Sequence, residues 1–383
     1  MRTARVVIVL LLALTTACTR SRRANRGTVR DEKPKPSQIT QAPLKIVFFD
    51  LGQADAMLVL FDGKTLLMDA GESRESSDTD KFHSIAKTLE QLTGSKHLDY
   101  FVLSHYHRDH VGDPSGTGPW GVINDGVTID TIFDRGEIIY GDDSKGGTQK
   151  DFERGVTGWL STGKAKAHRP VNVGDSVDLG EGLKVVVVAV NGNGNFEQLV
   201  KDKPEELSAF PASENDYSVA LKLTYGDFEL FAGGDLTGET SHRNFKGSRE
   251  GYHDVESSTA ARVGDVEIYR VNHHGSAHSS NPCFVKVLHP EVSIISSGAN
   301  NYGHPSARAY DPLMDMGKVF ITGGADDKVK DHVYRSIVGG DITVNVETGG
   351  KRFSVNGRDF NSKTEEQEAA LPDHMDSCPP RPW

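Results

Sequence analysis

Short apolar runs bounded by glycine, aspartate and other turn residues dominate the chain from about Leu44 onward. The runs KIVFFD, MLVLF and TLLMDAG predict three strands, because each is short and rich in β-branched or large apolar residues. A helix is predicted next, since Phe82, Ile85, Leu89 and Leu92 recur at helical spacing. The run LDYFVLSH then predicts a further strand that ends in polar residues.

The second half of the chain is also rich in predicted strands. They are TIDTIF, KVVVVAV, SVALKLTYG, FELFAGGD, DVEIYRVNHHGS, VSIISSG and KVFITG, with a hairpin at ITVNVETGGKRFSV and one helix around Phe152–Leu160. This mixture of strands and helices indicates an α/β fold with α+β character. The Asn/Gly-rich stretch at 191–215 is a candidate lid over a site or, equally, a surface loop.

The first 18 residues, MRTARVVIVLLLALTTAC, have the features of an export signal. Arg2 and Arg5 give a basic start, and the apolar core Val6–Leu14 is too short to span a bilayer. A buried N-terminal helix is the alternative. Cys18 resembles the lipidated cysteine of bacterial lipoproteins, although the usual leucine three residues before it is absent. We therefore expect an exported, periplasmic or cell-envelope lipoprotein that is anchored to a membrane through Cys18.

Composition divides the rest of the chain into three segments. Residues 19–42, rich in Arg, Lys, Pro and Ser, predict a flexible linker, residues 43–357 predict one enzyme-sized domain, and residues 358–383 predict a polar tail. After Cys18 only Cys283 and Cys378 remain. Two distant cysteines do not make a disulfide framework, so Cys283 is interpreted as structural, although the two could pair in an oxidising compartment.

The net charge of the chain is −11, so no large uniform basic field draws it to nucleic acid. We expect no stable nucleic-acid complex. Hydrolysis of a phosphodiester is not excluded, because metal ions neutralise a phosphate locally. No oligomeric state is predicted.

The stretch SHYHRDHVGD carries the strongest chemical signal, directly after the predicted strand LDYFVLSH. His105, His107, Asp109 and His110 follow the spacing H-x-H-x-D-H, and imidazole and carboxylate are ligands of zinc, manganese and iron. One ion rarely needs all four groups, so the pattern suggests two neighbouring ions. The alternative is a polar loop without a ligand.

Two further predicted strands end in residues of the same kind. Asp235 closes LFAGGD, and a carboxylate at a strand end can give one oxygen to each of two ions. His273 and His274 follow EIYRV in the stretch VNHHGS. Either could complete the shell of a metal while the other orients a ligand or contacts the substrate.

With these motifs the chain resembles the metallo-β-lactamase-fold hydrolases. It is similar to the hydrolase domain of ComEC-type competence proteins and to phosphorylcholine esterases. The matching stretches are FFDLGQADA, LLMDAG, LSHYHRDHVGD, ENDYSVALKLTYG, LFAGGD, VNHHGSAHSS and SSGANNYGHPS. The resemblance implies a four-layer αββα sandwich with a dinuclear site on one edge, holding two zinc ions or, alternatively, manganese or iron.

The resemblance also implies roles for individual residues. The first metal would be bound by His105 and His107, and the second by Asp109, His110 and His274, with Asp235 bridging the two and His273 as the alternative to His274. Asp69 would support the ligands from behind. Asn215 and Ser218 stand where the superfamily has a third histidine for the first metal, so one ion is expected to bind tightly and the other weakly.

The implied reaction is hydrolysis of a phosphodiester by a metal-activated hydroxide. Asp109 would orient that nucleophile, and His304 would contact the substrate or protonate the leaving group, with Asn300 as a further contact to substrate oxygens. A structural loop role is the alternative for His304. A β-lactamase or lactonase and a non-catalytic binding protein are the competing functions. Lysines and arginines do not cluster near the motifs, which favours a small substrate.

Overall fold

The computed structural model describes residues 42–71, 83–137, 146–194, 212–239, 251–298, 300–322, 328–329, 332–333, 340–370, 375 and 377–378. The predicted export signal, nearly all of the predicted linker and most of the candidate lid lie outside this part of the chain. None of the helices in these ranges is long and apolar enough to cross a membrane.

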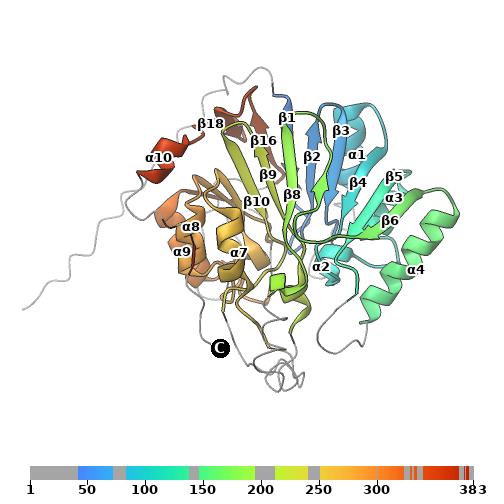
Figure 1. Ribbon diagram of the computed structural model, residues 1–383. Helices are drawn as coiled ribbons and strands as arrows, with labels where there is room; N and C mark the ends of the chain where they lie inside the picture. Colours follow the sequence, from blue (N-terminus) through green and yellow to red (C-terminus); the bar gives the residue numbers. More distant parts are fainter. Residues whose placement is uncertain are drawn as a thin grey trace, which may run out of the picture. The chain divides into compact units, whose positions relative to one another are not determined.

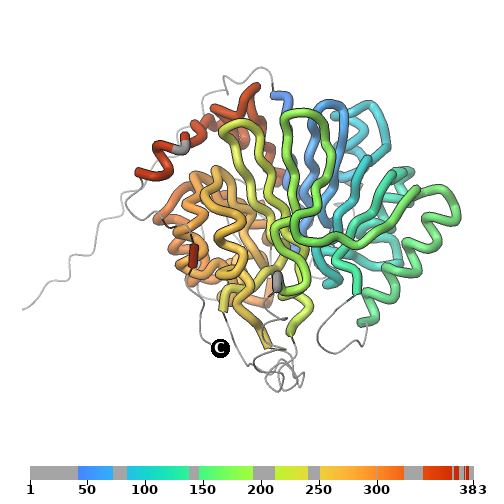
Figure 2. Tube along the Cα trace, viewed as in Figure 1, coloured from blue at the N-terminus to red at the C-terminus, as the bar shows by residue number. Residues whose placement is uncertain are grey.

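Two β-sheets form the centre of the described fold (Figure 1). Sheet A has nine strands in the order β18 (Arg358–Asn361), β17 (Arg352–Val355), β16 (Ile342–Val346), β1 (Leu44–Phe48), β2 (Met57–Phe61), β3 (Lys64–Met68), β4 (His97–Val102), β5 (Thr128–Asp134) and β6 (Ala165–Pro170). The strands from β18 to β3 pair antiparallel, whereas β3 to β6 pair parallel. Figure 2 shows the start of the folded chain lying beside strands from its C-terminal part.

Sheet B repeats this mixture of antiparallel and parallel pairs. Its seven strands run in the order β13 (Lys318–Ile321), β12 (Val292–Ile295), β11 (Ile268–Arg270), β10 (Phe228–Ala232), β9 (Ala220–Tyr225), β8 (Leu183–Ala189) and β7 (Ser176–Val177). The strands β10 to β13 are parallel and β7 to β10 antiparallel. A separate small pair is formed by β14 (Lys328–Val329) and β15 (His332–Val333).

Helices cover the outer face of each sheet. Sheet A is covered by α1 (His83–Thr93), α3 (Gly118–Asn124) and α4 (Gly147–Ser161), and sheet B by α7 (Val255–Val263), α8 (Pro282–Leu288) and α9 (Ala307–Met316). Shorter elements complete the described chain: α2 (Arg108–Val111), η2 (Asn191–Gly194), η3 (Glu214–Tyr217), η4 (Asn272–Gly275) and α10 (Glu365–Ala369).

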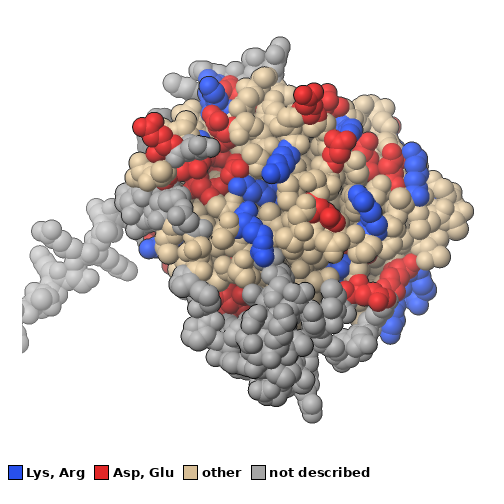
Figure 3. Space-filling view, in the orientation of Figure 1, with Lys and Arg blue, Asp and Glu red and all other residues tan. Residues whose placement is uncertain are grey.

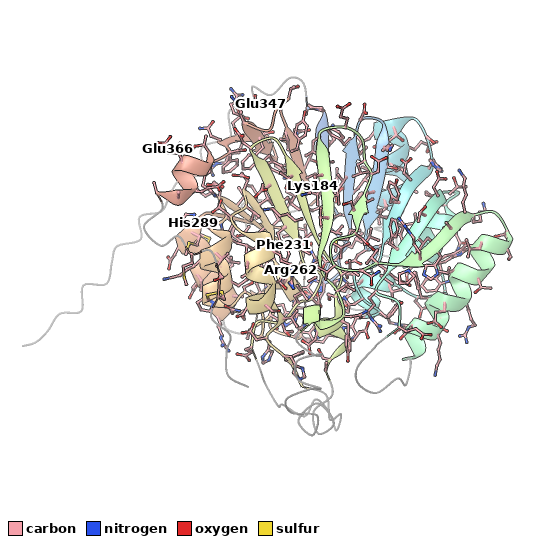
Figure 4. All side chains as sticks on the ribbon, in the orientation of Figure 1. Lys184, Phe231, Arg262, His289, Glu347 and Glu366 are labelled. Atoms are coloured by element: carbon pink, nitrogen blue, oxygen red, sulfur yellow. A yellow bond between two sulfur atoms is a disulfide. The ribbon has the colours of Figure 1, made fainter. Side chains whose placement is uncertain are left out.

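Side-chain alternation along the strands explains this layering. In β1, Ile46 and Phe48 face the core between the sheets, whereas Val47 faces the helices outside sheet A. In β10, Leu230 faces the inner core, whereas Phe231, which is labelled in Figure 4, lies in the outer core. The Phe231 ring packs against Phe284 of α8 at 5.5 Å between ring centroids. These strands in the middle of the sheets therefore bury both faces, and the four layers follow the order helices, sheet A, sheet B, helices. The predicted αββα sandwich is confirmed.

The prediction for the C-terminal segment is wrong at its start. Residues Arg358–Asn361 form β18, which pairs with β17 as the edge strand of sheet A. Its mostly exposed side chains, RDFN, lack the apolar alternation that marked the other strands. The folded domain thus continues past residue 357.

The two distant cysteines form the pair that the sequence left open as an alternative. Cys283 at the start of α8 and Cys378 form a disulfide across a separation of 95 residues. Their Cα atoms are 5.7 Å apart, within the range that such a bond requires. The disulfide fastens Cys378 to the helical layer outside sheet B, which the spacing of two cysteines alone could not indicate.

Candidate metal centre

The predicted site residues come from the C-terminal ends of strands in both sheets. Asp69 follows β3 and His105 follows β4 in sheet A, whereas Asp235 follows β10 and the pair His273 and His274 follows β11 in sheet B. Parallel strands in each sheet bring these ends to one edge. Side chains far apart in the sequence therefore gather where the two sheets meet.

One group of donors, here called the second-metal group, consists of Asp55, His110, Asp235 and His274. All four are buried, and one donor atom of each lies within 4.8 Å of those of the others. Asp235 Oδ1 is 3.0 Å from His110 Nε2 and 3.9 Å from His274 Nε2. Asp55 Oδ2 is 3.7 Å from His110 Nε2. Two imidazoles and two carboxylates form a donor set that zinc, manganese or iron accepts.

A second cluster, here called the first-metal group, consists of His105, His107 and Asp235. The ring atoms His105 Nε2 and His107 Nδ1 are 3.1 Å apart. Asp235 Oδ2 lies 3.8 Å from His105 Nε2 and also 3.8 Å from His273 Nε2. His273 is thus on the side of the first-metal group, while His274 belongs to the second-metal group.

Asp235 connects the two groups because its two oxygens face different histidines. Burial by itself would raise the pKa of Asp235, but the neighbouring His110, His273 and His274 hold it well below the usual value. The side chain is therefore an anion between two sets of imidazoles. This is the placement that a bridging carboxylate requires.

The polar atoms of the second-metal group fit a bound cation. His110 Nε2, His274 Nε2 and Asp235 Oδ1 are buried without a hydrogen-bond partner among the described residues, while Asp55 Oδ2 forms an ion pair with Arg270. A buried donor or acceptor without a partner costs about 1–3 kcal/mol each. A divalent ion would satisfy the carboxylates and the imidazole nitrogens at once. The residues present therefore fit a metal centre.

Hydrogen bonds made by the Nδ1 atoms of His110 and His274 leave the Nε2 atoms facing this centre. His110 Nδ1 donates to Asp69 Oδ2 at 2.9 Å, which leaves Nε2 toward Asp235. Asp69 also accepts from Ser104 N at 2.7 Å. His274 Nδ1 donates to the carbonyl oxygen of Ser296 at 2.7 Å. Such bonds orient metal-binding histidines and raise the basicity of the free nitrogen.

Asp109 lies at the rim of the second-metal group. Its Oδ2 is 3.3 Å from His274 Nε2, and about a third of its side chain remains exposed. Its carbonyl oxygen accepts from Asp55 N at 2.9 Å. The Asp109 carboxylate thus lies between the buried donors and the solvent.

Asn215 and Ser218, on and after η3, contact the same centre without adding an imidazole. Ser218 Oγ accepts from Asp235 N at 3.1 Å and so holds the backbone of the bridging carboxylate. Asn215 Nδ2 is 3.1 Å from His273 Nε2. His273 therefore stands next to the position where the third histidine was expected. Their placement agrees with supporting roles around the donors.

His304 approaches the donors from the loop after β12. Its ring centroid is 5.2 Å from that of His273 and 6.4 Å from that of His274. Burial lowers the pKa of His304 well below its usual value. The Asn300 side chain bonds to the backbone of the same loop: its Oδ1 accepts from His304 N at 3.2 Å, and its Nδ2 donates to His304 O at 2.6 Å. Asn300 therefore supports the loop that carries His304, and its contact with substrate stays a prediction.

Two functional candidates escaped the sequence reading. Asp55 belongs to the second-metal group, although the sequence marked it only as part of the matching stretch FFDLGQADA. Arg270, at the end of β11, is buried, forms an ion pair with Asp55 and donates from Nη1 to Gly234 O at 2.9 Å. A carboxylate in a turn between two apolar strands was the available signal for Asp55. No sequence pattern marks Arg270, because its partner is distant in the chain.

The backbone that carries the histidine pair is unusual. His273 and His274 have φ of 51° and 52°, so two consecutive non-glycine residues adopt the left-handed region. This conformation costs about 1–2 kcal/mol for each residue and must be held by surrounding contacts. The neighbouring Asn272 donates from Nδ2 to Glu256 Oε1 at 2.9 Å. Burial raises the pKa of Glu256 to about 8.

The αββα layers, with candidate metal-binding residues on the edge between the sheets, have the architecture that the resemblance to metallo-β-lactamase-fold hydrolases implies. No protein family model matches the chain. The sequence is similar to ComE operon protein 3 of Bacillus subtilis (strain 168), with 26% identity over 273 residues. The match covers 68% of this chain and 29% of that protein, so the chain spans less than a third of its relative.

Solved structures that resemble the chain carry related descriptions. The metallo-β-lactamase fold protein YhfI from Bacillus subtilis has 11% identity, with 73% of this chain and 97% of that chain covered at a TM-score of 0.42. Igni18, a metallo hydrolase from the archaeon Ignicoccus hospitalis, has 13% identity, with 73% and 95% covered at a TM-score of 0.36.

Proposed function

We propose that the protein is a metal-dependent hydrolase that cleaves phosphodiester bonds and binds two divalent ions, with zinc as the first choice. The observation that supports this most directly is the position of Asp235. Its two oxygens face separate groups of histidines, with Oδ1 3.0 Å from His110 and Oδ2 3.8 Å from His105. A shared carboxylate of this kind is expected where two ions act on one phosphoryl group. The similarity to ComE operon protein 3 agrees with the resemblance to ComEC-type proteins, over less than a third of that protein.

Two ions bound here would supply an activated water at neutral pH and neutralise charge on the phosphoryl oxygens. The chain's own residues orient the water and form hydrogen bonds with the substrate. Asp109, partly exposed beside His274, accepts a hydrogen bond from the entering water and orients it. His304, with its lowered pKa, is a neutral imidazole at neutral pH and therefore acts as a hydrogen-bond partner of the substrate rather than as a store of a proton.

The place of the reaction is part of the proposal. We infer that the protein is exported and anchored through a lipid on Cys18. The disulfide between Cys283 and Cys378 supports an oxidising compartment, because such bonds are rare in the cytosol. On the face drawn in Figure 3, acidic and basic side chains are interspersed. This mixture and the net charge of −11 favour a small phosphodiester over a stable nucleic-acid complex.

Hydrolysis of a chromogenic phosphodiester by the full chain, loaded with zinc or manganese, tests this function. The expected result is metal-dependent turnover that Asp109→Ala abolishes. Asp113→Ala is the matched control, because it removes a carboxylate of the same segment that pairs with Arg108, whereas Asp109 lies beside His274. A chromogenic β-lactam and a lactone are the competing substrates. Turnover of either one, with none of the phosphodiester by a verified metal-loaded protein, would contradict the proposal.

A further inference from the structure

Glu256, on α7, is a buried carboxylate that no part of the proposed reaction uses. It accepts three hydrogen bonds: Oε1 from Asn272 Nδ2 at 2.9 Å and from Ser280 N at 2.7 Å, and Oε2 from Asn281 N at 2.7 Å. Its side chain is fully buried. These partners lie at the two ends of the segment 272–281. One carboxylate therefore closes the loop that carries both histidines of the centre.

The loop has a costly backbone conformation that surrounding contacts must support, because His273 and His274 both have positive φ. Local bonds contribute: Ser276 N donates to His273 O at 2.8 Å, and Ser279 Oγ donates to Asn272 O at 2.8 Å. These bonds stay within the loop and do not fix it to the rest of the fold. The bonds to Glu256 do, since α7 belongs to the helical layer outside sheet B. The bonds from His274 Nδ1 to Ser296 O and from Ser306 N to Gly275 O add further links from the middle of the loop.

Glu256 also reaches the turn that carries Asp235. A Cβ atom on Gly233 would lie 2.3 Å from Asn272 Oδ1, and one on Gly238 would lie 2.0 Å from Glu256 Oε2. The Asn272 side chain therefore occupies space that only a glycine leaves free. The carbonyl oxygen of Gly234, which follows Gly233 in the chain, accepts a hydrogen bond from His273 N at 3.1 Å. The bridging carboxylate and the histidine pair thus share one support.

We propose that Glu256 is a positioning residue of the metal centre. Through Asn272 and the backbone at Ser280 and Asn281, it holds the left-handed turn so that His273 faces the first-metal group and His274 the second. Glu256 itself touches neither metal nor substrate. The inference rests on the proposed metal centre, but not on which bond the enzyme cleaves.

Zinc affinity of the full chain, measured by competition with a chromophoric chelator, tests this role without any substrate. Glu256→Ala is expected to weaken zinc binding about 10–100-fold, the usual effect of removing a group that orients metal ligands. Glu256→Gln keeps one acceptor oxygen, so its zinc affinity is expected to lie between those of the wild type and Glu256→Ala. Asn272→Ala removes the same hydrogen bond by deleting its donor. The double variant Glu256→Gln/Asn272→Ala should therefore lose less zinc affinity than the sum of the losses in the two single variants.

Glu267→Gln is the matched control. Glu267 is another buried glutamate with a raised pKa, and it accepts from Glu229 N at 2.6 Å and from Lys363 N at 3.1 Å. It precedes β11, whereas the histidine pair follows that strand. Glu267→Gln should therefore change folding stability while zinc affinity stays at the wild-type value.

The outcomes separate the two proposals. Wild-type zinc affinity in folded Glu256→Gln and Asn272→Ala would overturn the positioning role and leave the metal centre standing. Equal losses of affinity in Glu256→Gln and Glu267→Gln would also overturn it, because a general loss of stability would then explain both. A wild-type chain that binds no zinc or manganese would overturn the metal centre and this inference with it.

Discussion

His110 Nδ1 donates a 2.9 Å hydrogen bond to Asp69 Oδ2, and the opposite ring nitrogen of His110 lies 3.0 Å from Asp235 Oδ1. Asp69 therefore sets which face of the imidazole meets the centre. Asp69→Ala is expected to lower zinc affinity about 10–100-fold, because the ring loses its fixed orientation. Asp178→Asn, which alters an exposed ion pair with Lys64, should leave affinity unchanged. Equal affinities in wild type and Asp69→Ala would contradict this interpretation.

Asp235 should control how many ions the chain holds. Asp235→Ala removes a donor from both groups at once, so zinc content is expected to fall from two ions per chain to one or fewer. His107→Ala, which alters only the first-metal group, should leave the second ion in place. Elemental analysis after dialysis measures both. Two ions retained by Asp235→Ala would rule out the bridging role.

His273 and His274 should belong to different ions, and a double-mutant design separates them. In a His107→Ala background the first ion is already weakened. There, adding His273→Ala should change zinc binding little, whereas adding His274→Ala should remove the remaining ion. Titration of each variant with zinc gives the answer. The reverse order of effects would exchange the two assignments.

The disulfide should stabilise the helical layer outside sheet B. Cys283→Ser is expected to lower the free energy of unfolding by about 2–4 kcal/mol, because a long loop is released in the unfolded chain. Cys378→Ser should have the same effect, and the double variant should add nothing further. Urea denaturation, with and without reductant, checks these values. Insensitivity of the wild type to reductant would speak against the bond.

Stability should fall as the pH rises toward 8, because burial raises the pKa of Glu267 to about 8 and that of Asp265 to about 7. Between about pH 4.5 and 8 the unfolded chain ionises Glu267 while the folded chain keeps the proton. Folding then takes up a proton, so a rise in pH costs up to about 1.4 kcal/mol per pH unit for this group. The facing charges are Lys363, Glu291 and Glu368, of which Lys363 opposes the shift.

Urea denaturation of the metal-free chain at pH 5.5, 7 and 8.5 measures this slope. Glu267→Gln cannot ionise, so its stability should depend less on pH than that of the wild type. Identical slopes for the two proteins would show that Glu267 does not titrate in this range.

Much of the fold could be predicted from the spacing of apolar residues and from turn residues, because most strands are apolar runs with clear boundaries. The run KIVFFD became β1, and the hairpin at ITVNVETGGKRFSV became β16 and β17. Helix α8 was missed, since its seven residues, PCFVKVL, are too few for helical spacing to stand out. Helix α9 was missed as well, and it contains Pro312, which argues against a helix in any sequence reading.

The metal-binding motif was visible because four donors stand within six residues of one strand end. Residues that support or complete it are not visible in this way. Asp55 pairs with Arg270, and Glu256 with Asn272, so each acquires its meaning only from a partner in another part of the chain. His273 and His274 face different donor groups because both residues have positive φ, which no local propensity predicts for histidine.

The register of β1 has a consequence for the order in which the chain is made. One side of β1 pairs with β2, but the other pairs with β16, where Leu44 meets Val346. While a ribosome or a translocon still holds the later residues, that side of β1 is an open edge, able to pair with another molecule. Every candidate ligand lies between Asp55 and His274. During synthesis the chain therefore contains every candidate ligand before β16, the strand that pairs with the open side of β1, has been made.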